Sequence, residues 1–241
     1  MIERGFCVVS VQYRLIDEHN TRPPYIRDCV IDAKDAMRFL AKNAETYHLD
    51  HRRFFTFGDS AGGQIAQMLL LSPSDTLLGD ADLYRWDESY TLRAGVSWYG
   101  PSDFEKTELM NWNDDPDFVN RFIPRICGAR KADDCPLGRV REVSPVQYLE
   151  TNSPPLLLIH GDGDETIPIK QAYYMKNRAN EIGARVETMY VKNAGHNWKL
   201  VEDEMQIEPT KDEIVRATVA FLADHCPGKL GDERWEENTR Q

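Results

Sequence analysis

The sequence predicts an α/β fold in which a mostly parallel sheet is flanked by helices. Apolar, β-branched runs of strand length alternate with amphipathic runs of helix length, the order typical of such a sheet. A G-x-S-x-G motif stands where one strand-like run passes into a helix-like run. With 241 residues the chain has the length of one large domain. We therefore expect one α/β domain over residues 1–226 and a polar C-terminal tail over 227–241.

The N-terminal part of the chain is expected to supply two strands with a helix between them. Residues 6–13, FCVVSVQY, are β-branched and apolar enough for a buried strand. After Pro23 and Pro24, apolar side chains recur at spacings of three and four residues, which predicts a helix that covers the sheet. The members of this apolar face are Ile26, Val30, Ala33, Met37 and Leu40. Residues 53–58, RFFTFG, predict the second strand, and a helix over 61–71 follows it.

The rest of the chain is expected to continue the alternation. Residues 93–100 and 154–161 predict the third and fourth strands. A helix follows the fourth strand and ends at Gly183, with an apolar face made of Ala172, Met175, Ala179 and Ile182. Residues 185–191, RVETMYV, predict the fifth strand, and 210–225 predict a last helix. We find no internal repeat in the sequence.

One long segment interrupts this pattern. Residues 101–153 are rich in Pro, Asp and Trp and lack a clear period, which is typical of a lid or a binding insertion. The five cysteines are scattered, so they predict neither a disulfide framework nor a metal site. Only Cys127 and Cys135, which bracket a polar loop in this insertion, are placed to pair.

The composition excludes several classes of partner. A formal net charge of −11 and a pI near 5.1 leave no basic surface for nucleic acid. No run approaches the roughly 18 apolar residues of a membrane span. The printed N-terminus lacks a secretory signal, so we expect a cytoplasmic chain, and a secreted one only if a leader precedes Met1. The oligomeric state stays open.

Ser60 is the predicted nucleophile. Gly58, Ser60 and Gly62 form the G-x-S-x-G motif at a strand-to-helix junction, where a sharp turn pushes the serine hydroxyl outward and requires small residues on both sides. The helix that follows points its N-terminus at the reacting carbonyl, and the amide of Ala61 is expected to donate to the developing oxyanion. The alternative is a glycine-rich turn that only packs a helix on a strand.

A serine nucleophile needs a base and an orienting acid, each expected just after a later strand. His196 follows the fifth strand in KNAGHNW and is the predicted base, whereas His160 ends a strand and is expected to be a structural hydrogen-bonding residue. Asp162, Asp164 and Glu165 are candidate acids, and Asp164 has the better case because the Gly-Asp-Gly turn before it lifts it toward the base.

Two further features allow alternative interpretations. The acidic cluster after the fourth strand lacks the regular ligand spacing of a calcium loop, so no metal and no organic cofactor are expected. Aromatic side chains near the predicted site are expected either to line a substrate pocket or, more often for such residues, to pack in the core. The candidate substrate-binding residues are Asp59, Trp98, Tyr99 and Trp198.

These segments together resemble the α/β-hydrolase superfamily, and within it the esterases that include acetyl xylan and feruloyl esterases and the hormone-sensitive-lipase-like carboxylesterases. The resemblance rests on collinear matches along nearly the whole chain: VVSVQYRL, FGDSAGGQIA, VSWYGPSDF, SPPLLLIHGDGDETIP and VKNAGHNW. It implies an α/β-hydrolase fold in which Ser60 is the nucleophile, His196 the base, Asp164 the acid and Ala61 one oxyanion donor. No cofactor is implied.

The chain departs from this family at its N-terminus. The family's His-Gly-Gly oxyanion loop follows a strand that precedes residues 6–13, and neither is present in the printed sequence. That strand would lie between the strands at 6–13 and 53–58. We expect a truncated chain, direct pairing of the two flanking strands, or a strand supplied by another chain. Because one oxyanion donor is worth about 10²- to 10³-fold in turnover, we expect weak or no activity from this chain.

The predicted function is that of a serine carboxylic-ester hydrolase acting through an acyl-enzyme on small acyl esters. The esters are acetyl or aryl esters, including carbohydrate-linked ones. Two alternatives stay open from the sequence: a catalytically impaired hydrolase fold that binds a partner, and a formamidase or prolyl-oligopeptidase-like peptidase with the same triad.

Overall fold

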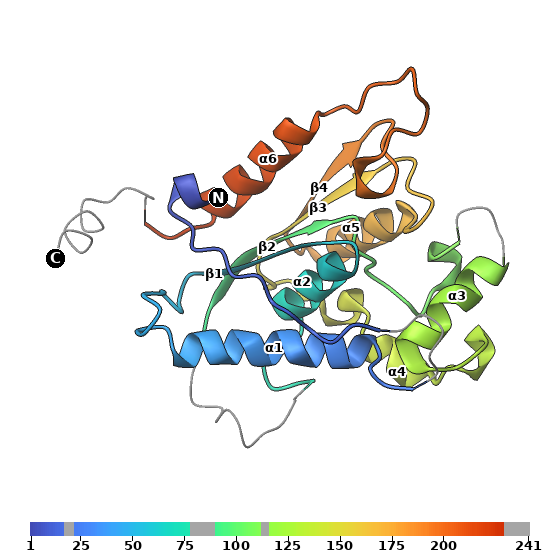
Figure 1. Ribbon diagram of the computed structural model, residues 1–241, viewed down its shortest axis with the longest axis horizontal. Helices are drawn as coiled ribbons and strands as arrows, with labels where there is room; N and C mark the ends of the chain where they lie inside the picture. The colour runs from blue at the N-terminus through green and yellow to red at the C-terminus, as the bar shows by residue number, and fades with distance from the viewer. Residues whose placement is uncertain (17–21, 78–89, 112–115, 229–241) are drawn as a thin grey trace.

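The computed structural model describes residues 1–16, 22–77, 90–111 and 116–228, so most of the expected C-terminal tail lies outside the described residues. Its sheet confirms the predicted α/β class (Figure 1): four parallel strands lie side by side in chain order. They are β1 (Phe54–Asp59), β2 (Leu92–Trp98), β3 (Leu156–Gly161) and β4 (Val186–Val191). Each matches one of the expected strands after the first.

The described helices include all those expected. They are α1 (Ile26–Lys42), α2 (Ala61–Leu71), α3 (Pro116–Cys127), α4 (Leu137–Glu142), α5 (Lys170–Ile182) and α6 (Lys211–Asp224). α5 ends at Gly183, whose φ of 77° is the left-handed conformation that glycine adopts without a steric cost. Thr210 and Glu213 cap each other at the start of α6, which fixes where that helix begins.

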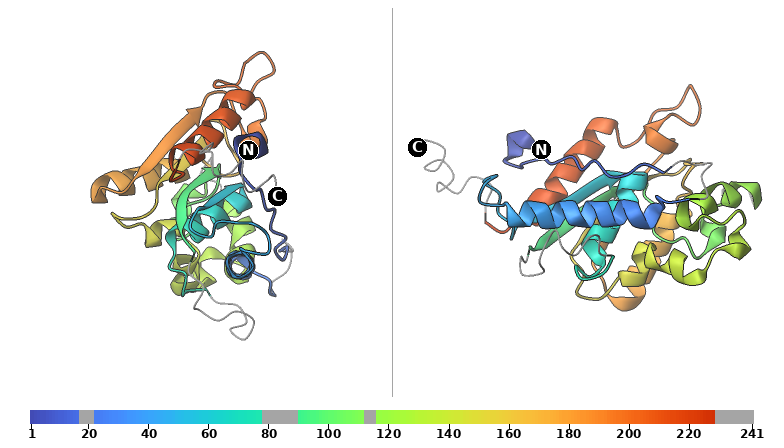
Figure 2. Two further views of the ribbon diagram at one scale, coloured as in Figure 1. Left: turned by 90° about the vertical axis from the view of Figure 1, so that its left-hand side faces the viewer. Right: turned by 60° about the horizontal axis from the view of Figure 1, so that its bottom comes forward.

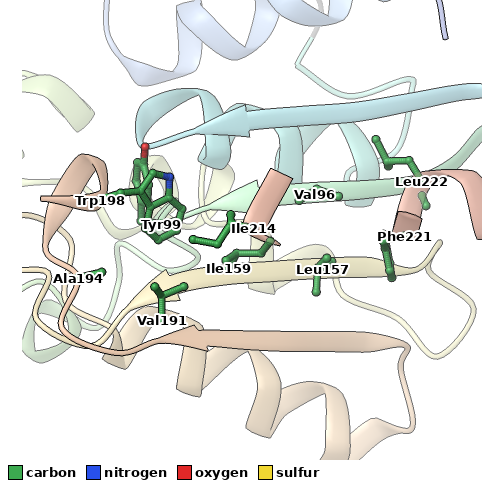
Figure 3. Close-up of a cluster of buried hydrophobic side chains, with 11 residues drawn as sticks. Val96, Tyr99, Leu157, Ile159, Val191, Ala194, Trp198, Ile214, Phe221 and Leu222 are labelled. Carbon is green, nitrogen blue, oxygen red and sulfur yellow. The ribbon is translucent and has the colours of Figure 1, made fainter. Parts of the chain in front are cut away.

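Helices cover both faces of the sheet, and alternate side chains of β3 pack against the helices of the two faces. Leu157 and Ile159 point to the face covered by α6, where they join Ile214, Phe221 and Leu222 (Figure 3). The alternate residues Leu156 and Leu158 point to the face covered by α2 and α5. Figure 2 shows α6 and α2 on opposite sides of the sheet. Burial on both faces explains why the first four residues of β3 are an unbroken apolar run.

The expected strand at residues 6–13 is wrong. This segment has no regular secondary structure, and Val8 and Val9 are 54% and 48% exposed. Among the described residues, no backbone hydrogen bond joins it to β1, so direct pairing of the flanking strands, one of the three alternatives, is not found. A β-branched run forms a strand only where a neighbour offers backbone partners.

β1 is consequently an edge strand. The amide of Phe54 donates to Thr91 O at 3.0 Å and that of Ser60 donates to Trp98 O at 2.9 Å, both on the β2 side. Since backbone groups alternate along a strand, the amides of Phe55 and Phe57 face away from β2. On that side lies a cavity of about 620 Å³, lined by residues of the N-terminal segment, α1, β1 and α6. This cavity is distinct from the place where the strand-end loops meet.

The insertion at 101–153 contains α3 and α4 and is tied to the sheet helices by buried polar side chains. Gln171 of α5 accepts from the amides of Ser102 and Asp103, each at 2.8 Å, and the Ser102 hydroxyl donates to Gln67 of α2 at 2.9 Å. Gln64 of α2 donates to Val143 O at 2.7 Å. Cys127 and Cys135 form the disulfide that their positions favoured.

Candidate active site

Ser60 stands on the turn between β1 and α2. Its φ of 51° and ψ of −119° are strained for a residue with a side chain, a conformation that costs about 1–3 kcal/mol. Two backbone bonds hold the turn, because Ser60 N donates to Trp98 O at 2.9 Å and Gln64 N donates to Ser60 O at 3.1 Å. The turn therefore places the hydroxyl at the carboxyl end of the sheet.

Glycines around Ser60 contribute in different ways. A Cβ on Gly58 would lie 2.2 Å from Gly62 O, so no larger residue fits there without moving the turn. A Cβ on Gly62 would meet nothing within 4 Å, and the expectation that this position must lack bulk is wrong. The close approach on that side is at Gly63, where a Cβ would lie 2.7 Å from Ser97 Oγ. The role of Gly62 is therefore in its backbone, because its carbonyl oxygen is the atom that a side chain on Gly58 would collide with.

His196 lies between Ser60 and Asp164. Its Nε2 is 3.0 Å from Ser60 Oγ and its Nδ1 is 2.8 Å from Asp164 Oδ2. The carboxylate can only accept, so Nδ1 carries the proton and Nε2 is free to accept from the serine hydroxyl. The loop that carries His196 is closed by a backbone bond from Gly195 N to Lys199 O at 2.7 Å. Three side chains far apart in sequence thus form one hydrogen-bonded line.

Of the three candidate acids, only Asp164 contacts His196. It is fully buried, and its Oδ1 accepts from the amides of Thr166 and Ile167, each at 2.9 Å. Asp162 and Glu165 are exposed. Two backbone donors on one oxygen leave the other oxygen directed at the imidazole, which fixes the orientation of the His196 ring.

His160 is buried beside this acid and is structural, as expected. Its Nε2 is 2.7 Å from Ile167 O and 3.7 Å from Asp164 Oδ2. Burial lowers the pKa of His160, so the ring is neutral and its Nε2–H donates to the carbonyl rather than pairing with the carboxylate. His160 therefore ties the end of β3 to the loop that carries Asp164.

Ala61 is the first residue of α2 and follows Ser60 directly. Amides in the first turn of a helix have no partner within the helix, and they carry the positive end of its dipole. Within the described ranges, no group of three His, Cys, Asp or Glu side chains is arranged to hold a metal ion. Nor does any described helix have the length and apolar character needed to cross a membrane.

Residues 1–179 match the protein-family model BD-FAE. This match covers most of the chain and includes the Ser60 turn. The chain belongs to the BD-FAE family. Curated relatives of this BD-FAE member include the esterase LipC of Mycobacterium tuberculosis, which is 28% identical over 212 residues, 88% of this chain and 49% of LipC.

A second relative is the isoprenylcysteine alpha-carbonyl methylesterase ICME of Arabidopsis thaliana, 23% identical over 224 residues, 92% of this chain and 50% of that protein. The chain thus spans about half the length of these curated relatives. Among solved structures, Thermogutta terrifontis esterase 2 phosphonylated by sarin aligns with a TM-score of 0.62 at 19% identity, covering 85% of this chain and 69% of that one.

A truncated form of a carbohydrate esterase from gut microbiota aligns with a TM-score of 0.60 at 20% identity, covering 82% of this chain and 68% of that one. At this level of identity the structural neighbours establish the fold, and this BD-FAE member has the α/β-hydrolase fold.

The expected aromatic residues of the site lie in one cluster. Tyr99 and Trp198 are buried, whereas Trp98 is half-buried and donates through Nε1 to Thr218 Oγ1 at 2.9 Å. The structure therefore places Tyr99 and Trp198 in the core, and a role for them or for exposed Asp59 in substrate binding stays a prediction. Sequence reasoning missed the contact between Tyr99 and His196, since no local pattern links residues so far apart.

Proposed function

We propose that this BD-FAE member is a serine carboxylic-ester hydrolase that acts on small acyl esters through an acyl-enzyme. The observation that carries the proposal is the line of hydrogen-bonding distances from Ser60 Oγ to His196 Nε2 and from His196 Nδ1 to Asp164 Oδ2. This is the arrangement in which a weak hydroxyl nucleophile is activated by a base that a buried acid orients. The esterase names of the relatives support the same reaction class.

The reaction follows from these groups. Ser60 Oγ attacks the ester carbonyl while His196 Nε2 takes its proton, and the buried carboxylate of Asp164 stabilises the imidazolium. The amide of Ala61 donates to the tetrahedral oxyanion, and the imidazolium returns the proton to the leaving alcohol as the ester C–O bond breaks. Water then attacks the acyl-enzyme with His196 again as base, which releases the acid and restores Ser60.

For the substrate we propose small acyl groups, acetyl or aryl, on small-molecule or carbohydrate-linked alcohols. A carbohydrate esterase among the structural neighbours supports the second kind of alcohol. The side chain of His196 is only 15% exposed, so little of the imidazole is open to an incoming ester.

The test is hydrolysis of p-nitrophenyl acetate by the wild-type chain and by Ser60→Ala, together with labelling by a fluorophosphonate. We expect labelling and weak but measurable turnover in the wild type, and a loss of both in the variant. Turnover that survives in Ser60→Ala would show that another group is the nucleophile. A folded wild type that neither turns over nor labels would instead favour the impaired, partner-binding alternative.

A further inference from the structure

Tyr99 is held rigidly at the carboxyl end of β2. Its amide donates to Ile159 O of β3 at 2.8 Å, and its side chain is only 3% exposed. Its φ of 38° is positive, a conformation that residues with side chains rarely adopt. The backbone thus fixes the direction of the Cα–Cβ bond of Tyr99.

The Tyr99 ring contacts two other rings, and Figure 3 shows it beside one of them, Trp198. Its centroid is 4.8 Å from that of the His196 imidazole, with the planes inclined by 61°, and 4.7 Å from that of Trp198. Its hydroxyl donates to Asp59 Oδ2 at 3.3 Å, and Asp59 directly precedes Ser60. One side chain therefore contacts the predicted base with its ring and the neighbour of the predicted nucleophile with its hydroxyl.

Backbone strain is concentrated around this side chain. Ser60, Tyr99, Asn197 and Trp198 have φ values of 51°, 38°, 59° and 56°. For Ser60, Tyr99 and Trp198 such a conformation costs about 1–3 kcal/mol and persists only where the surroundings over-determine it, whereas asparagine adopts it readily. Tyr99 and Trp198, whose rings are in contact, both retain this strain, which indicates that their surroundings hold the two residues in place.

We propose that Tyr99 is a positioning residue that sets the distance and tilt of the His196 imidazole relative to Ser60. The proposal rests on the proposed function. Since the Tyr99 ring packs against the His196 imidazole and its hydroxyl is bonded to Asp59, the residue before Ser60, it limits rotation of the imidazole away from the serine. It touches no reacting atom and is not a catalytic residue.

The ring and the hydroxyl of Tyr99 contribute unequally to the position of His196. The ring fills the space beside the imidazole, and a misplacement of about 1 Å in a reacting group can cost about 10²-fold in rate. The hydroxyl contributes one hydrogen bond to the carboxylate of Asp59. Burial and the nearby Asp59 raise the pKa of Tyr99, so this hydroxyl stays protonated and keeps donating throughout the working range of an esterase.

The experiment compares Tyr99→Leu, Tyr99→Phe and Phe221→Leu. Phe221 is a matched control because it is a buried aromatic residue of the same hydrophobic cluster, belongs to α6, and has its ring against His225 rather than His196. The readouts are kcat and KM for p-nitrophenyl acetate and the low-field proton resonance of His196 Nδ1–H, which reports the bond to Asp164. Thermal unfolding of each variant measures the structural cost separately.

We expect Tyr99→Leu to lower kcat by about 10²-fold with little change in KM, and to shift or broaden the resonance. Tyr99→Phe keeps the ring and should recover kcat to within about 3- to 10-fold of wild type. Phe221→Leu should lose stability but keep kcat and the resonance. The proposal is overturned if Tyr99→Leu keeps wild-type kcat, or if the resonance is unchanged in a folded Tyr99→Leu.

A second arm covers the case in which Tyr99→Leu does not fold. Tyr99→Phe and Asp59→Ala remove the two ends of the same hydrogen bond, so their effects on kcat should be non-additive in the double variant. Full additivity would overturn the link from Tyr99 to the serine turn. Failure of the proposed function is seen separately, as absent turnover in the wild type, and the resonance of the variants still tests the position of the imidazole.

Discussion

β1 and β3 are strands of equal length with similar apolar composition, yet their surroundings differ sharply. β3 pairs with β2 on one side and β4 on the other, and every one of its residues is buried. β1 pairs with β2 alone, borders the 620 Å³ cavity, and leaves Phe57 44% exposed. Ser60 follows β1 and Asp164 follows β3, so Ser60 is attached to a partly exposed edge strand and Asp164 to a buried central strand.

This difference shows that burial of a strand is decided by its neighbours. Both strands have the residues of a central strand, and only β3 has the partners for it. Asp164, the predicted acid, is accordingly fixed by backbone bonds inside a closed core, whereas Ser60, the predicted nucleophile, is fixed mainly by its own strained turn and by β2.

The largest expected effect is a loss of kcat on substitution of Asp164, the residue that follows β3. Asp164→Asn keeps the shape of the side chain but removes the charge that orients and stabilises the imidazolium, so kcat for p-nitrophenyl acetate should fall by about 10⁴-fold. Asp162→Asn changes an exposed neighbour two residues away and should leave kcat within a few-fold of wild type. The reverse ranking in a steady-state assay would move the acid to Asp162.

The next effect compares the stabilities of the two strands. Ile159→Ala in β3 should lower the free energy of unfolding by about 2–5 kcal/mol, because the side chain is fully buried. Phe57→Ala in β1 removes a larger side chain, but one that is 44% exposed, and should cost about 1 kcal/mol.

Val9→Ala is the control for the unpaired N-terminal segment and should change the free energy of unfolding by less than about 0.5 kcal/mol. Urea denaturation measures all three variants. If Phe57→Ala costs as much as Ile159→Ala, β1 is covered in solution by something that packs on its free edge, and the contrast between the strands disappears.

The smallest effect concerns pH. Burial in β3 lowers the pKa of His160, so below its ordinary pKa of about 6.5 the unfolded chain binds a proton that the folded chain does not. The free energy of unfolding should therefore fall as the pH falls below about 6.5. His160→Gln keeps a donor for Ile167 O and cannot be protonated, so it should reduce this dependence.

His48→Gln changes an exposed histidine and should leave the pH dependence as it is in the wild type. Denaturation curves between pH 5 and 8 provide the comparison. An equal slope for wild type and His160→Gln would mean that the acid sensitivity comes from other groups.

Much of the fold follows from local patterns, and the error at residues 6–13 shows their limit. The bounds of α2 agree with the expected helix, because its apolar spacing and the glycines of its first turn are local signals. The run FCVVSVQY carries the same signal as a true strand, but strand formation also needs a partner on the neighbouring chain segment. Sequence periodicity contains no information on whether that partner is present.

The residues of the candidate site could be named from the sequence where chemistry restricts the choice of residue. A nucleophile, a base and an acid at the ends of successive strands are few enough to be assigned in order. Gly63 and the contacts of Tyr99 were not predictable, because they depend on the packing of α2 and of the His196 loop against β2. Gln67 and Gln171 resemble solvent-facing helix residues, and only the structure shows that they are buried.

Gln67 and Gln171 have a consequence for how the molecule unfolds. They accept buried hydrogen bonds from two amides and one hydroxyl of the insertion, and lifting the insertion would leave both glutamines without these partners, at about 1–3 kcal/mol each. Opening it as a hinged flap therefore costs a large part of the stability of a typical domain. The insertion and the sheet should melt in one cooperative transition, and a protease should find no intermediate in which the insertion alone is cut away.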